Sequence, residues 1–206
     1  RIGGSPSSKN GVVSLEYEKM SKWRGSHESG EFHSAADRLK VMDEEDTLIS
    51  VNYPTLLLQW PIAKDPKLNQ ALTRAYNNWV CDISSQAPER LKWVTVICPS
   101  DPEEAAREMI RTKKMGSVGV MVLGEYNEKG LDHPDFEIIW QTANDIGMPV
   151  NVHPGTGALK AWEDYPSVAS DQFLMSVVRG FKTICSSGIL DRYPDVTVSF
   201  LETGCT

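Results

Sequence analysis

The sequence predicts an α/β fold in which parallel strands alternate with helices, and two observations support this prediction. Five short apolar runs have the length of strands, and one helix-bearing connection separates each run from the next. The connecting helices are amphipathic, and two of them end at a glycine. Strands that alternate with single helices pair in parallel through right-handed crossovers. The pattern therefore predicts a doubly wound sheet or part of a (β/α)8 barrel, and periodicity does not decide between them.

The first predicted elements lie in the N-terminal half. Apolar residues at helical spacing predict a helix from Ala35, and residues 48–54 form a short β-rich run that ends at a proline. We expect the next helix to begin at Asp65 and Pro66. A proline fits the first turn of a helix, since its missing N–H has no hydrogen-bond partner there. Residues 91–98 are the second apolar strand.

The helix after Pro66 has a predicted apolar face. We expect Trp79 to lie in the core, and we expect Asn77 and Asn78 to lie on the helix surface. The residues of the predicted apolar face are Leu68, Leu72, Ala75, Trp79 and Ile83.

Helices and strands continue to alternate in the C-terminal half. Asp101 and Glu104 have the spacing of a capping box, in which each side chain bonds to a free amide at a helix start. His133 precedes a proline at the next helix start, where a capping role is expected. The remaining elements are strands at 118–123, 149–153 and 196–202, helices that stop at Gly116 and Gly147, and a helix at about 172–186.

Composition excludes several classes of function. The chain has 206 residues, with 21 Lys and Arg against 28 Asp and Glu, and a net charge of −7. This acidity argues against nucleic acid or an anionic membrane as the main partner. No GxGxxG, Walker or GxSxG motif is present. The cysteines are scattered, which favours a reduced, cytoplasmic protein over a disulfide scaffold. They are Cys81, Cys98, Cys185 and Cys205.

Two residues at predicted strand ends are candidates for chemistry. His153 ends the run 149–153, and Glu202 ends the run 196–202. Ligands of parallel α/β folds bind at the carboxyl ends of strands. An imidazole there can bind a divalent metal or act as a base, and it can also be a plain hydrogen-bonded residue. A carboxylate behind so apolar a run is paired, bound to metal or at the solvent-facing mouth, and parity does not show which way Glu202 points.

Four further residues are candidates for substrate binding at the same mouth. Tyr53 and Thr55 follow the first strand, and Glu125 follows the strand at 118–123. Thr156 lies in the glycine-rich loop after His153, where the glycines allow a backbone to approach a ligand closely.

Several stretches, in order, resemble the amidohydrolase-related family, in the branch with aminocarboxymuconate-semialdehyde and resorcylate-type decarboxylases. One of them is Gly-Met-Pro-Val-Asn-Val-His-Pro at 147–154, and another is Phe-Leu-Glu-Thr-Gly at 200–204. The resemblance implies a (β/α)8 barrel with a divalent metal at its carboxyl-end mouth. The other matching stretches are 38–43, 51–55, 75–79, 101–105, 131–136 and 187–194.

The resemblance also implies roles for His153 and Glu202. His153 matches the metal ligand at the end of the fifth barrel strand. Glu202 stands where many relatives have a sixth-strand histidine, and a carboxylate is a competent ligand for zinc or manganese. We therefore expect one divalent ion, with His153 and Glu202 as ligands and Glu202 also as a catalytic acid.

The resemblance further implies that the chain is part of a longer barrel. The family's first-strand ligand pair and eighth-strand Asp have no counterpart here, and the five strands count as the second to the sixth. The chain begins with Arg1 and stops in the motif that contains Glu202. We expect an internal stretch of a longer enzyme, with residues 1–34 as an irregular polar arm or lid and 35–206 as a partial TIM-barrel domain.

Three functions remain as hypotheses. The first is a metal-dependent lyase that decarboxylates an aromatic or muconate-type carboxylic acid. The second is hydrolysis of a lactone, amide or ester on the same barrel, which the fold does not exclude. The third is a non-catalytic binding domain or inert fragment. In the first two hypotheses the binding partner is a small-molecule substrate, a carboxylic acid in the first. A homodimer is our hypothesis for the assembly.

Overall fold

A computed structural model describes residues 34–54, 57, 65–126, 129–154 and 169–203, with side chains from 174 onward in the last range. The predicted arm at 1–34 therefore falls outside the described residues, apart from Ser34. Thr55, Thr156 and Cys205 also fall outside them.

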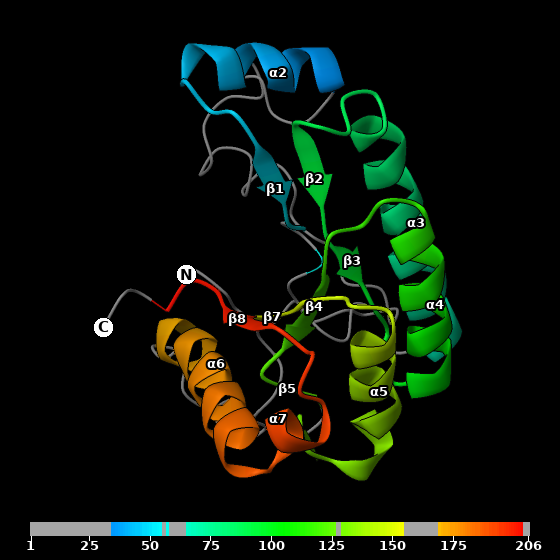
Figure 1. The fold of residues 1–206 in the computed structure, drawn as a ribbon, viewed down its shortest axis with the longest axis vertical. Coiled ribbons are helices and arrows are strands. Elements are labelled where there is room, and N and C mark those ends of the chain that lie inside the picture. The colour runs from blue at the N-terminus through cyan, green and yellow to red at the C-terminus, as the bar shows by residue number, and fades with distance from the viewer. Residues whose placement is uncertain (1–33, 55–56, 58–64, 127–128, 155–168, 204–206) are drawn as a thin grey trace.

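Parallel strands follow one another in chain order along a curved row (Figure 1). Backbone hydrogen bonds also join the two sheets of this row. Val94, in the segment between β2 and β3, donates its N–H to Asn52 O at 3.3 Å, and Val118, two residues before β4, donates its N–H to Trp93 O at 3.0 Å. The predicted parallel α/β arrangement is confirmed. The strands are β1 (Ser50–Asn52), β2 (Leu91–Trp93), β3 (Thr95–Val96), β4 (Val120–Leu123), β7 (Val150–His153) and β8 (Val198–Phe200).

Helices connect these strands, and α3, α4 and α5 lie along one side of the row (Figure 1). A short antiparallel hairpin after β4 and a four-residue helix before β8 are additions that the sequence did not predict. The helices are α2 (Ala35–Glu44), α3 (Pro66–Ser84), α4 (Pro102–Lys114), η1 (Pro134–Phe136), α5 (Glu137–Asp145), α6 (Ala169–Ser186) and α7 (Ile189–Arg192). The hairpin strands are β5 (Glu125–Tyr126) and β6 (Lys129–Gly130).

Side-chain caps begin these helices where the sequence predicts them. The Asp65 side chain accepts from Lys67 N at 2.9 Å, and Asp101 accepts from Glu104 N at 3.1 Å. His133 Nδ1 accepts from the N–H of Asp135 at 3.2 Å, which confirms its expected capping role. Each cap satisfies an amide that has no partner within its own helix.

Strand residues alternate between two sides of the row. Val120 and Val150 pack with Met109 of α4 and Trp140 of α5 in the main core cluster. Met121, next to Val120, packs in a second cluster, because successive side chains of a strand point to opposite faces. The main core therefore lies between the strands and the helices. No helix in the described part of the chain is long and apolar enough to cross a membrane.

Helix α3 reverses the prediction made for its two faces. Trp79, expected in the core, is 47% exposed, whereas Asn77, expected on the surface, is fully buried. Leu68 and Leu72 are also exposed, at 37% and 38%, and Ile83 is buried as predicted. The side that faces the protein is largely polar and comprises Asn69, Thr73, Asn77, Val80, Ile83 and Ser84.

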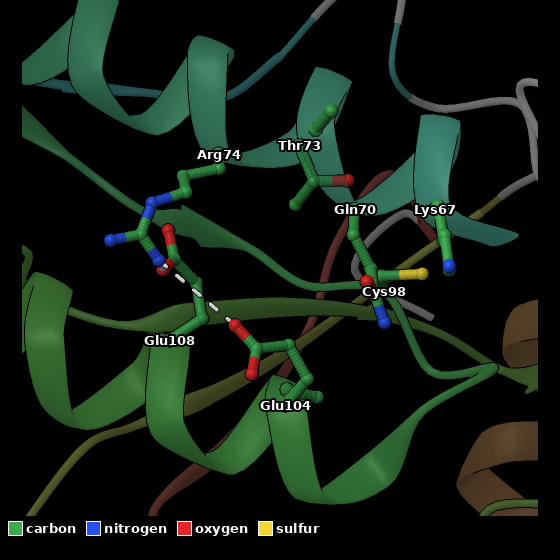
Figure 2. Close-up of a pocket in the computed structure, with 9 residues that line it drawn as sticks. Lys67, Gln70, Thr73, Arg74, Cys98, Glu104 and Glu108 are labelled. Atoms are coloured by element: carbon green, nitrogen blue, oxygen red, sulfur yellow. Dashed lines mark hydrogen bonds and ion pairs between the residues drawn. The ribbon is translucent and has the colours of Figure 1, made fainter.

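A cavity of about 250 Å³ separates the N-terminal halves of α3 and α4 (Figure 2). Three of its charged groups already pair with one another, since Arg74 lies 3.3 Å from Glu108 and 4.0 Å from Glu104. None of the site residues predicted from the sequence lines it. The lining residues are Lys67, Gln70, Ala71, Thr73, Arg74, Cys98, Glu104, Ala105 and Glu108.

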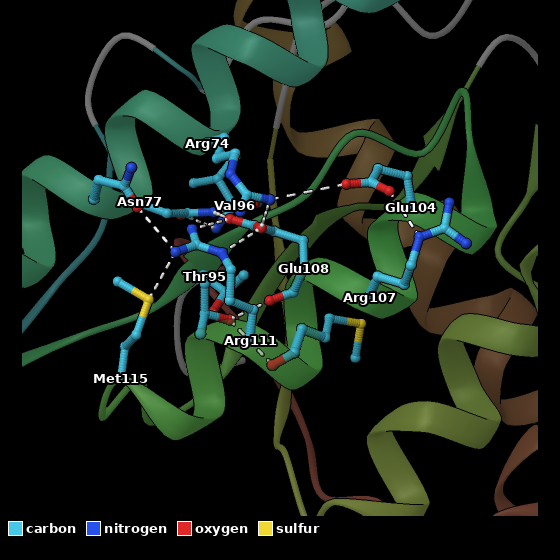
Figure 3. Close-up of polar contacts among 12 residues, drawn as sticks. Arg74, Asn77, Thr95, Val96, Glu104, Arg107, Glu108, Arg111 and Met115 are labelled. Carbon is cyan, nitrogen blue, oxygen red and sulfur yellow. Dashed lines mark hydrogen bonds and ion pairs between the residues drawn. The ribbon is translucent and has the colours of Figure 1, made fainter.

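Asn77 is buried because its side chain replaces a missing strand neighbour (Figure 3). Strand β1 pairs with β2 but not with β3. The Asn77 carboxamide donates to Val96 O at 2.9 Å and accepts from Val96 N at 3.0 Å. It also donates to Glu108 Oε1 at 2.9 Å. Hydrophobic periodicity missed this, since two backbone hydrogen bonds outweigh the preference of an amide for water.

Candidate active site

His153 ends β7, where the sequence predicts a functional residue. Its side chain is 5% exposed, and Leu123 of β4 lies opposite it in register. Nδ1 lies 2.6 Å from the carbonyl oxygen of Pro154. Because a carbonyl oxygen only accepts, Nδ1 carries the hydrogen, and a neutral ring then has its lone pair on Nε2. Nε2 lies 3.4 Å from Oε1 of Glu202, so this nitrogen faces a carboxylate.

Glu202 reaches His153 because the chain turns after β8. The helix-side core cluster packs against Val198 and Phe200, so alternation along the strand would direct residue 202 to that side as well. However, β8 ends at Phe200, and Glu202 has a φ of 56°, a left-handed conformation that is unfavourable for residues other than glycine. The turn brings the half-exposed carboxylate to His153. This settles the direction that strand parity left open.

Tyr53 also lies near His153. It follows β1, and its ring centroid lies 6.3 Å from that of the imidazole, with the two planes tilted by 37°. Burial raises the pKa of Tyr53 above its ordinary value, so the side chain is a neutral phenol at neutral pH. The structure thus brings together three of the residues predicted from the sequence, from the ends of three different strands.

Glu125 has a different environment from these three residues. Its side chain is 1% exposed and forms an ion pair with Arg179 of α6. The neighbouring Tyr126 accepts a hydrogen bond from Leu123 N at 2.8 Å, which holds the hairpin to the end of β4. Substrate binding by Glu125 stays a prediction, and so do the roles of Thr55 and Thr156 outside the described residues.

Two features of the site could not be found by sequence reasoning. Arg179 pairs with Glu125 from a distant helix, and neither periodicity nor a motif marks it. The left-handed turn at Glu202 likewise has no glycine or asparagine to announce it. Within the described residues, no group of three or more His, Cys, Asp and Glu side chains is arranged to hold a metal ion.

Among curated proteins, the chain is similar in sequence to a decarboxylase. The chain is 27% identical over 179 residues to the gamma-resorcylate decarboxylase of Polaromonas sp. strain JS666. The match covers 78% of this chain and 53% of the relative, so the chain spans about half the length of that protein.

Solved structures show the same fold at lower identity. The 5-carboxyvanillate decarboxylase of Novosphingobium aromaticivorans, with bound manganese and 3-methoxy-4-hydroxy-5-nitrobenzoic acid, superposes with a TM-score of 0.70 at 21% identity, covering 79% of this chain and 48% of the other. The 2,6-dihydroxybenzoate decarboxylase from Rhizobium gives 0.65 at 20% identity, covering 79% and 54%. The parallel strands described above are therefore an arc of a (β/α)8 barrel, as the resemblance implied.

The model of the amidohydrolase family matches residues 56–206, which is most of the chain. This match includes both His153 and Glu202. It agrees with the resemblance that the sequence motifs indicated, and the chain belongs to the amidohydrolase family.

Proposed function

We propose that His153 and Glu202 belong to the divalent-metal site of a decarboxylase that acts on an aromatic carboxylic acid. The observation that carries this proposal is the imidazole Nε2 facing the Glu202 carboxylate at 3.4 Å. The relatives named above support the reaction class, since they are decarboxylases of hydroxylated benzoic acids by name. The activity proposed is that of the whole protein, of which the chain matches about half the length of these relatives.

His153 fits the role of a metal ligand. The Pro154 carbonyl holds the hydrogen on Nδ1, so that Nε2 is the ring nitrogen left to bind a metal ion. A nitrogen lone pair and a carboxylate oxygen at this distance favour a proton or a cation between them. Among the described residues the proposed site has two metal ligands, His153 and Glu202, so the further ligands would come from elsewhere.

Glu202 supplies the negative charge of the proposed site. Its side chain is 56% exposed, and its Oε1 lies 3.4 Å from Nε2 of His153. We assign it as a ligand, with proton transfer to the substrate as its second role. A carboxylate beside a neutral imidazole suits manganese or zinc, and the manganese in the 5-carboxyvanillate decarboxylase structure favours manganese.

Tyr53 is the proposed contact for the substrate. Its phenol can donate a hydrogen bond, and its ring offers an apolar edge to an aromatic substrate. When bound, a divalent ion supplies positive charge that holds the substrate carboxylate and a neighbouring oxygen. The side chains would orient the substrate. Glu202 in its protonated form would give a proton to the ring carbon as the bond from that carbon to the carboxylate breaks and carbon dioxide leaves, and solvent would then return the proton to Glu202.

Metal binding by this chain gives a direct test. Equilibrium dialysis against Mn²⁺, followed by electron paramagnetic resonance of the bound ion, would measure affinity in the wild type, His153→Ala and Glu202→Gln. We expect both substitutions to weaken binding, while His133→Ala, which changes an exposed helix cap, leaves it unchanged. Equal affinity in His153→Ala and the wild type would overturn the proposed site.

The reaction class needs the whole enzyme. We expect the manganese-loaded protein to release carbon dioxide from 2,6-dihydroxybenzoate or 5-carboxyvanillate without incorporating oxygen from labelled water. Opening of a lactone with incorporation of labelled oxygen, and no carbon dioxide release, would instead identify a hydrolase. Tyr53→Phe should raise KM more than it lowers kcat, because the Tyr53 phenol is the proposed contact for the substrate.

A further inference from the structure

We infer that three consecutive residues of α6, Arg179, Gly180 and Phe181, position His153 and Glu202 for their joint role. We call residues 179–181 the α6 contact. Each of the three touches a different strand of the row, or the segment that directly follows it. The inference rests on the proposed function in one respect, since it assumes that His153 and Glu202 act together.

Arg179 holds the segment that follows β4. Its guanidinium forms an ion pair with Glu125, whose side chain is buried, while that of Arg179 is 37% exposed. Glu125 stands two residues after Leu123, and Leu123 is the register partner of His153. The ion pair therefore ties α6 to the strand end that lies beside His153. A buried carboxylate needs such a partner, so the pair constrains both elements.

Gly180 brings the helix backbone directly against β7. A Cβ atom built on Gly180 would lie 2.9 Å from the Cα of Gly124 and 3.1 Å from Cγ1 of Val152. Both distances are shorter than ordinary contacts, so a side chain at this position would push α6 away from the strands. Val152 directly precedes His153. The glycine thus allows the helix to pack against the residue before the proposed ligand.

Phe181 reaches β8. Its ring packs edge-on against Phe200, with centroids 5.2 Å apart and planes at 72°. Phe200 is the last residue of β8 and stands two residues before Glu202. Phe181 is 53% exposed, so its side chain is only partly covered. In Figure 1, β8 lies above α6, and α6 runs away from it toward α7.

The α6 contact acts where the strand ladder stops. The N–H of Leu201 donates to Val152 O at 2.9 Å, and Glu202 then turns into its left-handed conformation. Backbone pairing fixes β7 and β8 only up to this point. Residues 179–181 brace the ends of β4, β7 and β8 against one rigid helix. They are positioning residues, since none of them is assigned a contact with the metal or the substrate.

Nuclear magnetic resonance of the chain tests this without any metal. We would label histidine side chains with nitrogen-15 and compare Arg179→Met and Phe181→Ala with matched controls on the same helix, Lys182→Met and Val178→Ala. We expect the two α6-contact variants to shift the His153 ring signals, with the His133 signals unchanged, while both controls leave all signals in place. Phe181→Tyr should restore the wild-type signals, since it keeps the ring.

Manganese affinity provides the second measurement. We expect Arg179→Met and Phe181→Ala to weaken Mn²⁺ binding roughly 10-fold, as substitutions behind a metal ligand do. Folded variants with unchanged His153 signals would overturn the inference. If Arg179→Met unfolds the chain, Arg179→Met with Glu125→Gln leaves no unpaired buried charge and carries the same test. Absence of Mn²⁺ binding in the wild type would contradict the proposed function alone, since the metal-free signals still report on the α6 contact.

Discussion

Nε2 of His153 lies 3.4 Å from Oε1 of Glu202, and this approach depends on the φ of 56° at Glu202. A side chain in the left-handed region places Cβ close to the carbonyl oxygen and costs about 1–2 kcal/mol. Non-glycine residues remain in such a conformation where surrounding structure over-determines it, and these positions cluster at functional sites. The turn is consistent with the proposed site, because relaxing it would move the carboxylate away from the imidazole.

The backbone strain at Glu202 can be measured with two substitutions that both remove the carboxylate. We expect Glu202→Gly to be about 1 kcal/mol more stable than Glu202→Ala, because only alanine keeps the Cβ that the left-handed conformation disfavours. Urea unfolding of both variants would give the difference. The same comparison at an exposed helical position, Lys182→Gly against Lys182→Ala, should favour alanine. Equal stability of the two Glu202 variants would contradict a strained turn.

The order and direction of the strands could be predicted because local rules determine them. Apolar runs separated by single helices predict parallel pairing, and the caps at Asp65, Asp101 and His133 mark helix starts from short-range spacing alone. Each of these features depends on residues within a few positions of one another, so a single sequence contains the whole signal.

Long-range contacts explain what could not be predicted. Periodicity assigned Trp79 to the core, but the hydrogen bonds between Asn77 and Val96 decide which side of α3 is buried. The direction of Glu202 depends on where β8 ends. The partner of Glu125 is on α6, and nothing in the sequence near Glu125 identifies it. For Asn77 and Glu125, the partner that decides the outcome lies far away in the sequence.

Asn77 should contribute strongly to stability. Asn77→Ala leaves the amide and carbonyl of Val96 buried without their partner, and we expect a loss of about 2–4 kcal/mol in the free energy of unfolding. Asn78→Ala is the matched control, because Asn78 is exposed and its hydrogen bond to Arg111 lies at the surface. Its expected cost is about 0.5 kcal/mol or less. Urea unfolding measures both, and similar costs would refute the strand-replacing role of Asn77.

Glu108 should make stability depend on pH in a defined interval. Burial by itself raises the pKa of Glu108, but hydrogen bonds from Arg111 and Asn77, and the charges of Arg111 and Arg74, bring that pKa below its ordinary value of 4.5. Since the pKa is lower in the folded chain than in the unfolded chain, ionised Glu108 stabilises the fold above pH 4.5. This contribution is lost as the pH falls from 4.5 through the folded-state pKa.

Unfolding free energies measured from pH 7 down to about pH 3 test this dependence. Glu108→Gln should be less stable than the wild type at pH 7, and its stability should fall less steeply below pH 4.5. Glu103→Gln is the control, because the Glu103 side chain is 76% exposed and pairs only at the surface with Arg107. A Glu108→Gln chain that loses stability as steeply as the wild type in this interval would show that Glu108 is not the group responsible.

Gly124 should tolerate no side chain, because α6 packs directly on it. A Cβ atom at this position would overlap the backbone carbonyl of Ser176, and a helix backbone cannot yield as a flexible side chain does. We expect Gly124→Ala to cost about 3 kcal/mol or more and to separate α6 from the strand ends. Gly147→Ala is the control, since Gly147 has a φ of 57° but no atom within 4 Å of a built Cβ. Its expected cost is about 1 kcal/mol, from backbone conformation alone.

If the two substitutions cost the same in urea unfolding, the close approach of α6 to Gly124 is not a source of stability. If Gly124→Ala alone also weakens Mn²⁺ binding, the packing of α6 on β4 supports the proposed site.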